Sequence, residues 1–486
     1  MKYLYFLLLT ILPVIGMSQE ISFSYDLYNT YENYREPSLN IRRIKHPDIL
    51  TLIHKLRHNS KFVVHKLGES VEKRELFLIK IGTGKTKIFL WSQMHGDEST
   101  ATMALFDIFN FFSANDFLNE TREKILSETT LYFLPMVNPD GAQIFQRRNI
   151  WELDLNRDAA RLVSPEAEIL MNTFDSLKAE FGFNLHDQNT RYSVGKDYKQ
   201  ATISFLAPAF NEQKEMSDKR ERAVKLIGMM NQILQQFIPG HVAKYSDEYE
   251  PRAFGDTFQK KGTSTILIES GGWKEDTEKQ FIRKINFISL LSGFFSITKN
   301  SYEEIPKENY DQIPFNDDQL FDLLLKNVTV EKNGRQIPLD IAINITEQNV
   351  DSGTAFTSFG SIEDIGDLSI FHGIEEMDCS GLVLKEGKIF PKKIETEKEL
   401  SEIDFQKLVE DGILFLPVQK TILKSKTKQQ LHDEFPVCLV EDSDFHADIK
   451  IGAKPAFYLY KNNKPKYVVS GGKVIRLNFY PVNSDR

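Results

Sequence analysis

Short apolar runs alternate with longer amphipathic stretches between about residue 75 and residue 300. We expect buried strands at KIFLW, LYFLPMV, FGFNLH, TISFLA and STILIE, and helices at STATMALFDIFNFF, SPEAEILMNTFDSL and EKQFIRKINFISLLSGFF. Ser99 or Thr100 is expected to cap the first helix and Ser164 the second. This alternation predicts an α/β domain with a mostly parallel mixed sheet flanked by helices.

The pattern changes after Lys299. Residues 301–316 are polar and contain two prolines, so we expect them to form a linker. Beyond it, short alternating runs and the turn dipeptides Asn333-Gly334 and Gly471-Gly472 are typical of hairpins. The sequence therefore predicts a larger domain over residues 19–300 and a smaller β-rich accessory domain over residues 317–486.

The first 18 residues have the layout of a secretory signal peptide. Lys2 precedes an apolar run that ends near Ile15, and the small residues Gly16 and Ser18 follow. No later run approaches the roughly 18 apolar residues that a membrane helix needs. We expect a secreted or periplasmic protein without a membrane anchor after removal of the signal.

Charge and cysteine content limit the kinds of partner and of metal site. The formal net charge is -9 and no block of lysine and arginine is present, which argues against nucleic acid as a partner. Cys379 and Cys438 are the two cysteines, and their spacing leaves open whether they pair. Two cysteines cannot build a cysteine-rich metal cluster, so histidine and carboxylate ligands are expected.

Two copies of a His-Gly-x-Glu pattern offer such ligands: His95 with Glu98, and His372 with Glu375. About one His-x-x-Glu is expected by chance in a chain of this length, so the surroundings must discriminate between the copies. The first copy follows a predicted strand and precedes a helix, at the strand end where open α/β sheets bind ligands. The second has no helix after it, and we expect a surface turn there.

A catalytic zinc ion takes three protein ligands and keeps one position open. The third ligand should come from the end of another strand. His186 closes the apolar run FGFNLH and is followed at once by polar residues. His186 is therefore a candidate third ligand, beside His95 and Glu98, for one Zn²⁺ per chain.

Two further segments, VNPDGAQIFQRRNIWELDLNRD and STILIESGG, make the sequence resemble the zinc carboxypeptidase family, the carboxypeptidase A-like metallopeptidases. The resemblance covers roughly residues 85–275 and implies a zinc carboxypeptidase-like catalytic domain. It matches His95, Glu98 and His186 to the zinc ligands. It also matches Asp154 to the carboxylate that orients a ligating histidine, and Glu269 to the general base.

The resemblance also implies how substrate is held. Asn156 and Arg157 match the pair that binds the terminal carboxylate of a peptide. Arg147 matches the arginine that stabilises the oxyanion, and the adjacent Arg148 is the alternative.

The parts of the family site that select substrate are less clear in this sequence. A tyrosine that closes on substrate is expected at Tyr249 or Tyr245, and spacing does not choose between them. The specificity pocket falls within residues 253–255, with Arg252 beside it. If the guanidinium of Arg252 points inward, it favours acidic termini such as those of cell-wall peptides.

These observations predict a secreted zinc metallocarboxypeptidase that acts on peptides with a free C-terminal carboxylate. One alternative is a zinc-dependent deacylase of N-acyl amino acids related to aspartoacylase, which uses similar ligands. Another is a peptide-binding protein on an inactive peptidase scaffold. The Asn-Pro-Asp-Gly turn and ILIESGG favour the peptidase over the deacylase, and the complete set of ligands and base disfavours a binding-only role.

Overall fold

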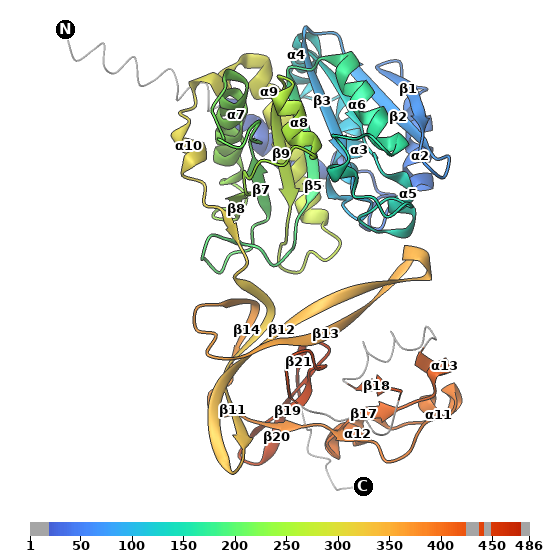
Figure 1. The fold of residues 1–486 in the computed structure, drawn as a ribbon, viewed down its shortest axis with the longest axis vertical. Helices are drawn as coiled ribbons and strands as arrows, with labels where there is room; N and C mark the ends of the chain where they lie inside the picture. Colours follow the sequence, from blue (N-terminus) through green and yellow to red (C-terminus); the bar gives the residue numbers. More distant parts are fainter. Residues whose placement is uncertain (1–18, 424–436, 442–448, 478–486) are drawn as a thin grey trace, which may run out of the picture. The chain divides into compact units, whose positions relative to one another are not determined.

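The chain folds into two compact units in a computed structural model that describes residues 19–423, 437–441 and 449–477 (Figure 1). Unit 1 runs to Asp318 and includes Asp351–Thr354, and unit 2 holds Gln319–Val350 and the chain from Ala355 onward. The predicted signal segment, residues 1–18, lies outside the described residues. Within the described ranges, no helix combines the length and the apolar character needed to cross a membrane.

An eight-stranded mixed sheet forms the centre of unit 1. Its strands are β1 (Phe62–Glu69), β2 (Glu75–Gly82), β3 (Thr86–Ser92), β4 (Thr129–Leu134), β5 (Phe181–Asp187), β7 (Ile203–Leu206), β8 (Val242–Lys244) and β9 (Ser264–Ser270). They lie in the order β1-β2-β4-β3-β5-β9-β7-β8. The central strands β4, β3, β5 and β9 are parallel, and antiparallel pairs flank them on both sides. The predicted α/β fold with a mostly parallel mixed sheet is confirmed.

Helices cover both faces of this sheet (Figure 1). The helices are α2 (His46–Leu56), α3 (Thr100–Ser113), α4 (Asn119–Glu128), α5 (Pro139–Ile144), α6 (Pro165–Leu177), α7 (Asp218–Leu234), α8 (Phe254–Lys260) and α9 (Gln280–Lys299), with short 3-10 turns η1 (Tyr31–Asn33) and η2 (Leu155–Arg157). Strand β3 shows why both faces need cover. Its side chains alternate, so Ile88 and Leu90 pack with α3, α7 and α9, while Phe89 and Trp91 pack with α6 and α8.

The helix starts follow the predicted capping residues in part. The side chain of Ser164 accepts a hydrogen bond from the backbone of Ala167, as expected for the N-cap of α6. Ser99 occupies the N-cap position of α3, but its hydroxyl donates to the backbone oxygen of Arg42 instead. At the start of α3, a contact with the distant residue Arg42 therefore takes the place of the local capping hydrogen bond.

The segment over residues 301–316, expected as a linker, belongs to the core of unit 1. It forms η3 (Ser301–Glu304) and α10 (Glu308–Asp311), and β10 (Asn316–Asp317) then pairs with β6 (Ser193–Val194). Tyr302, Ile305, Tyr310 and Ile313 are buried in the cluster that also holds α7 and α9. The apolar residues of this segment are widely spaced among polar ones, so the composition predicted a linker. Their burial shows that the linker prediction was wrong.

Unit 2 is rich in strands, as predicted. Its larger sheet is built from β11 (Leu320–Lys332), β12 (Arg335–Val350), β13 (Ala355–Gly366), β14 (His372–Asp378), β15 (Val383–Glu386), β19 (Ala456–Lys461), β20 (Lys464–Ser470) and β21 (Lys473–Arg476). A smaller sheet holds β16 (Lys388–Ile389), β17 (Ile413–Pro417) and β18 (Cys438–Val440), beside the short helices α11 (Glu397–Ser401), α12 (Phe405–Glu410) and α13 (Lys420–Leu423). A 3-10 turn, η4 (Asp351–Gly353), follows β12 in the chain.

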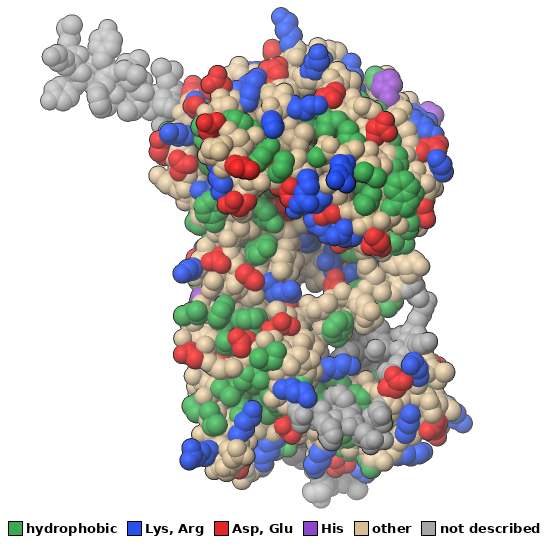
Figure 2. All heavy atoms as spheres, in the orientation of Figure 1, with side chains coloured by type: hydrophobic (Ala, Val, Ile, Leu, Met, Phe, Trp, Pro, Cys, Tyr) green, Lys and Arg blue, Asp and Glu red, His purple; other side chains and the backbone are tan. Residues whose placement is uncertain are grey.

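The hairpin turns of unit 2 use the predicted dipeptides. Asn333 and Gly334 both have positive φ between β11 and β12, and Gly471 and Gly472 do so between β20 and β21. Cys379 and Cys438 are both buried free thiols. On the face shown in Figure 2, acidic and basic side chains are interspersed over both units, so that face carries no broad field of one sign.

Candidate functional site

The carboxyl ends of the parallel strands β3, β5 and β9 meet at one edge of the unit 1 sheet. His95 lies in the loop that leaves β3, His186 lies near the end of β5, and Glu269 lies near the end of β9. Strand pairing places His186 directly opposite Glu269. The edge is therefore the ligand crevice expected for an open α/β sheet.

His95, Glu98 and His186 form a compact group of potential metal ligands. The Nδ1 atom of His95 lies 2.7 Å from Glu98 Oε1, and the Nδ1 atom of His186 lies 2.8 Å from Glu98 Oε2. One ligand atom from each residue lies within 4.8 Å of the others, and all three residues are buried. Two imidazole nitrogens and one carboxylate suit a catalytic zinc ion, so the donor set fits the predicted metal.

Glycine shapes the loop that carries His95 and Glu98. A Cβ atom on Gly96 would lie 2.1 Å from the backbone carbon of Gly141 in α5. That loop therefore passes too close to α5 for any side chain at this position. Asn138 supports the same region, since its side chain accepts a hydrogen bond from the backbone of Gly141. The Asn-Pro-Asp-Gly turn thus acts as the support against which the metal-binding loop packs.

Asp154 orients His95 from outside the metal-binding group, and Asn156 lies beside His186. Asp154 Oδ1 lies 3.1 Å from Nε2 of His95, and a proton on that nitrogen leaves the Nδ1 lone pair for metal. The same carboxylate oxygen accepts a hydrogen bond from the backbone of Asn156 at the start of η2. The side-chain nitrogen of Asn156 lies 3.5 Å from Nε2 of His186. Both ligating rings therefore have a polar neighbour at the nitrogen that faces away from the metal.

Arg147, not Arg148, faces the site. Nη1 of Arg147 lies 3.1 Å from Glu98 Oε1, and its Nη2 lies 3.1 Å from Asp154 Oδ2. Arg148 instead donates to the backbone oxygen of Glu152 on an exposed turn. The geometry thus resolves a choice that two adjacent arginines leave open in the sequence.

Burial and mutual charge set the protonation of the site. Burial works to raise the pKa of Glu98, but the two histidines hold it well below its ordinary value. Burial works to lower the pKa of His95, but Glu98 and Asp154 raise it to about 9. The buried carboxylate is therefore ionised and draws positive charge toward the group, as a cation site requires.

Glu269 has the opposite electrostatic environment from Glu98. Burial, together with the negative charge of Glu98, raises the pKa of Glu269 well above its ordinary value. A carboxylate with a raised pKa is a stronger base and is better matched to proton transfer near neutral pH. The environment of Glu98 thus favours its ionised form, and that of Glu269 favours its protonated form.

Arg157 lies at the rim of the site beside an acidic neighbour. Its side chain is 41% exposed, and its Nε atom lies 3.5 Å from Glu250 Oε2. Arg252 is 58% exposed and binds both carboxylate oxygens of Glu250, through Nε at 2.9 Å and Nη2 at 2.6 Å. Hydrogen bonds from Arg252 and the charge of Arg157 hold the pKa of Glu250 at about 2. The guanidinium of Arg252 is therefore engaged at the surface, and its selection of acidic termini stays a prediction.

Tyr245 and Tyr249 differ in what they face. Burial and then the charge of Glu269 raise the pKa of Tyr245, so its hydroxyl lies within the electrostatic reach of the base. The hydroxyl of Tyr249 accepts a hydrogen bond from Lys260 at 3.4 Å, and the side chains are exposed there. The role predicted for Tyr249 stays a prediction, and the structure places Tyr245 nearer the chemistry.

Sequence reasoning overlooked Asn184 and the buried ion pair behind the site. Asn184 lies two residues before His186 on β5, so the period of a strand places both side chains on one face. Lys279 Nζ lies 3.0 Å from Asp187 Oδ2, and Thr100 donates to the same oxygen at 2.6 Å. The strand period was available as a signal for Asn184, whereas Lys279 meets Asp187 only through the fold.

The second His-Gly-x-Glu copy lies in unit 2 on strand β14 instead of in the expected turn. His372 Nδ1 lies 3.5 Å from Glu376 Oε1, and Glu375 is exposed. In the part of the chain that the structure describes, the histidine and carboxylate group with metal-binding geometry is His95, Glu98 and His186. The first copy therefore carries the metal site.

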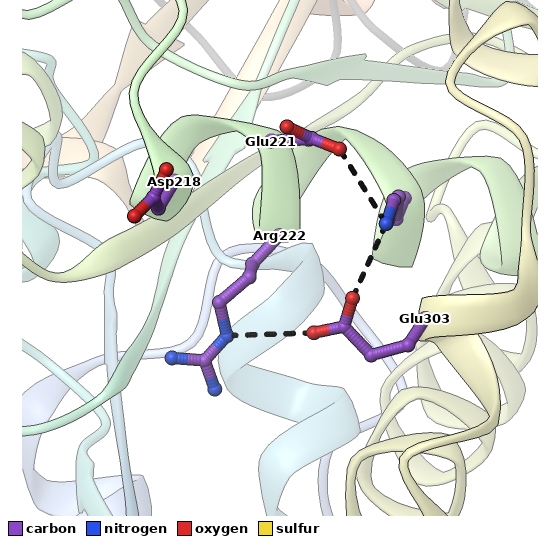
Figure 3. A pocket seen from close by; sticks show the side chains of 5 residues that line it. Asp218, Glu221, Arg222 and Glu303 are labelled. Carbon is purple, nitrogen blue, oxygen red and sulfur yellow. Dashed lines mark hydrogen bonds and ion pairs between the residues drawn. The ribbon is translucent and has the colours of Figure 1, made fainter.

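A separate surface hollow of about 230 Å³ lies on α7 and η3 (Figure 3). Its side chains pair with one another: Lys225 lies 3.4 Å from Glu221 and 3.3 Å from Glu303, and Arg222 lies 4.0 Å from Glu303. Exposed ion pairs of this kind contribute little and leave the charges mutually compensated. We assign no function to this hollow.

Comparison with known proteins agrees with the site geometry. Residues 49–226 match the family described as zinc carboxypeptidase. Carboxypeptidase B of Astacus astacus is 35% identical over 92 residues, which cover 18% of this chain and 29% of that protein. Carboxypeptidase 2 of Trichophyton equinum is 23% identical over 168 residues, which cover 32% of this chain and 31% of that protein. The chain thus spans less than a third of the length of these relatives.

Solved structures with a similar chain trace include a metallo-carboxypeptidase from Burkholderia cenocepacia. It has a TM-score of 0.42 and 15% identity, and the match covers 52% of this chain and 69% of that one. Bovine thrombin-activatable fibrinolysis inhibitor has a TM-score of 0.44 and 14% identity, over 56% of this chain and 100% of that one.

Proposed function

Since residues 49–226 belong to the zinc carboxypeptidase family, we propose that this protein is a zinc-dependent metallocarboxypeptidase that hydrolyses the C-terminal peptide bond of peptides. The observation that carries the proposal is the pairing of β5 with β9, which sets Glu269 beside the His95, Glu98 and His186 group. This arrangement combines a metal site with a base of raised pKa on one sheet edge.

A zinc ion held by His95, Glu98 and His186 would polarise the scissile carbonyl and lower the pKa of a bound water to about 7. Glu269 accepts the proton of the attacking water and returns it to the leaving amine, which the raised pKa of its carboxyl group favours. Asp154 keeps the ring of His95 in the ligating orientation through Nε2. Each of these roles is assigned to a side chain that the fold brings to the same edge.

Arg147 is the proposed donor to the developing oxyanion. Its guanidinium lies beside Glu98 and is fixed by two contacts to Asp154, at 3.3 and 3.1 Å. A donor fixed before the reaction needs no reorganisation when charge develops. Arg147 therefore stabilises the transition state from a position that the carboxylate of Asp154 maintains.

Asn156 and Arg157 are proposed to bind the terminal carboxylate of the peptide. A guanidinium binds a carboxylate through two parallel hydrogen bonds, which selects substrates with a free C-terminus. Glu250 contacts Arg157 at 3.5 Å, so an incoming carboxylate shares or displaces that contact. Tyr245 is the proposed tyrosine on the substrate side, because its hydroxyl lies within electrostatic reach of Glu269.

Export through the N-terminal segment is part of the same proposal. Lys2, the apolar run to Ile15 and the small residues before position 19 support it. Selection of acidic cell-wall termini by Arg252 would require its guanidinium to leave Glu250, whose two carboxylate oxygens it binds at the surface. Detection of the mature chain outside the cytoplasm, with an N-terminus near Gln19, tests the export proposal.

The test of function is the release of C-terminal amino acids from N-blocked dipeptides by the full chain loaded with zinc. We expect release that stops on chelation and returns with Zn²⁺. Hydrolysis of N-acetyl amino acids but not of dipeptides would instead indicate a deacylase. Zinc binding without turnover on either panel would indicate a binding protein on a peptidase scaffold.

A further inference from the structure

A buried carboxamide without a partner lies beneath the proposed catalytic edge. Asn184 on β5 is buried, and among the described residues neither its Oδ1 nor its Nδ2 has a hydrogen-bond partner. Leaving a buried polar group unpaired costs about 1–3 kcal/mol, so such groups normally have a partner. Asn184 shares a sheet face with the metal ligand His186, which follows two residues later. A hydrogen-bond partner for Asn184 would therefore come from the face of the sheet that carries His186.

The neighbours of Asn184 form a mainly apolar row on that face. Asn184 pairs in register with Leu267 of β9, and Leu267 pairs with Leu206 of β7. Leu267 is 8% exposed and Leu206 is 6% exposed, whereas Ile266 and Ile268 on the opposite face of β9 are fully buried. The small exposed fraction of these two leucines lies on the face of the sheet that carries Asn184 and His186.

Gly255 in the first turn of α8 keeps that space free. A Cβ atom at position 255 would lie 3.1 Å from Nδ2 of Asn184 and 3.5 Å from Pro208. A larger side chain would therefore cover the carboxamide. Glycine at position 255 therefore leaves the space next to the carboxamide unfilled by a side chain of α8.

The same turn of α8 is tied to the residues that are proposed to bind the terminal carboxylate. The backbone of Phe254 donates to Oδ1 of Asn156 at 3.0 Å, and Arg157 follows Asn156 in the chain. A peptide whose carboxylate binds Asn156 and Arg157 thus has its last side chain next to the turn that contains Gly255. That side chain is the group placed to reach Asn184.

We infer that Asn184 is a specificity-determining residue that hydrogen-bonds the side chain of the substrate's C-terminal residue and selects a carboxamide, asparagine or glutamine. This inference rests on the proposed carboxypeptidase function. A carboxamide offers one acceptor and two donors, which complement the donors and acceptor of Asn184. The apolar walls from Leu206, Leu267 and Pro208 supply no charge to bind an ionised side chain. A site that hydrogen-bonds a substrate group rejects analogues that lack it, because its own polar atoms are then left unpaired.

The experiment compares hydrolysis of N-blocked dipeptides that end in asparagine, glutamine, leucine, phenylalanine, aspartate and lysine. The wild type, Asn184→Leu and a control, Arg148→Ala, are assayed as full-length, zinc-loaded chains. We expect the wild type and the control to prefer asparagine and glutamine over leucine by about tenfold or more in kcat/KM, with the difference mainly in KM. Asn184→Leu should lose that preference and keep its zinc content.

A second variant and a binding assay test the same contact. Gly255→Ala places a Cβ atom over Asn184 and should weaken the same preference if Asn184→Leu fails to fold. Binding of free asparagine, glutamine and leucine, measured by calorimetry on the same chains, should follow the same order. A wild type that prefers leucine, phenylalanine, aspartate or lysine, or a preference that both variants leave unchanged, overturns the inference.

Failure of the proposed function has a different signature. The wild type would then release no C-terminal residue from any dipeptide, while the calorimetry still shows whether asparagine binds and whether Asn184→Leu abolishes that binding. Absence of asparagine and glutamine binding to an inactive wild type overturns both proposals.

Discussion

His186 on β5 lies directly opposite Glu269 on β9, so adjacent parallel strands present a metal ligand and the proposed base side by side. Residues in register on neighbouring parallel strands project to the same face of the sheet. The relative position of ligand and base is therefore set by backbone pairing of the sheet, and it does not depend on a flexible loop.

Metal binding should depend on the first His-Gly-x-Glu copy alone. We expect chelation to abolish activity and added Zn²⁺ to restore it, because His95, Glu98 and His186 converge on one point. His186→Ala should remove the bound zinc measured by atomic absorption. His372→Ala is the matched change in the second copy and should leave zinc content and rate near wild type. Loss of one zinc per chain in His372→Ala would contradict the assignment.

The change Glu269→Gln should separate catalysis from metal binding. The amide cannot accept a proton from water, so we expect kcat to fall by about 10²–10⁴-fold while zinc content stays at one per chain. Steady-state kinetics and metal analysis on the same preparation check both parts. If zinc and rate were lost together, Glu269 would have a structural role instead.

The adjacent arginines offer an internal comparison. Arg147→Ala should lower kcat by about 10²–10³-fold, since it removes a fixed donor to the oxyanion. Arg148→Ala should leave kcat near the wild-type value, because Arg148 donates only to the backbone of Glu152 in the contacts described. Equal losses in the two variants would show that the effect comes from the local loop and not from the facing guanidinium.

The two candidate tyrosines can be distinguished by removal of a single hydroxyl. We expect Tyr245→Phe to lower kcat/KM by about tenfold, the value of one hydrogen bond to substrate. Tyr249→Phe serves as the control, since its hydroxyl contacts Lys260 at 3.4 Å on the surface. Kinetics on the preferred dipeptide check this, and a loss confined to Tyr249→Phe would restore the assignment suggested by the sequence.

Asp116 links acid pH to the stability of unit 1. Its two carboxylate oxygens each accept a hydrogen bond of 2.8 Å from the buried Arg122, and Tyr34 donates to it at 2.7 Å. The hydrogen bonds from Arg122 are the main cause of a pKa of about 2, below the ordinary value of 3.8. A lowered pKa means that the stabilisation is complete above the unfolded value of 3.8 and is lost as pH falls toward 2.

Asp116→Asn should therefore lower the free energy of unfolding of unit 1 by about 1–2 kcal/mol at pH 7. The difference from wild type should persist at pH 5 and narrow at pH 3. Urea unfolding monitored by tryptophan fluorescence at the three pH values measures it. A difference that stays constant down to pH 3 would show that the charge of Asp116 is not its source.

Much of the site could be predicted because its signals are local. The run KIFLW and the polar residues after it predict a buried strand that ends in a ligand loop, and the structure has β3 followed by His95. Residue type and position at a strand end thus make His95, Glu98 and His186 candidate ligands, and the resemblance to the zinc carboxypeptidase family joins them into one set.

Only the tertiary structure decided which of several equivalent side chains face the site. The sequence determined that arginine stands at positions 147 and 148 and that tyrosine stands at 245 and 249. The side chains within each pair point in different directions, because long-range packing sets the turns that carry them. The same holds for the segment over residues 301–316, whose polar composition predicts a linker although packing against α7 and α9 buries its apolar side chains. The reason is physical: composition and period report local backbone preference, whereas direction and burial depend on contacts between residues distant in the chain.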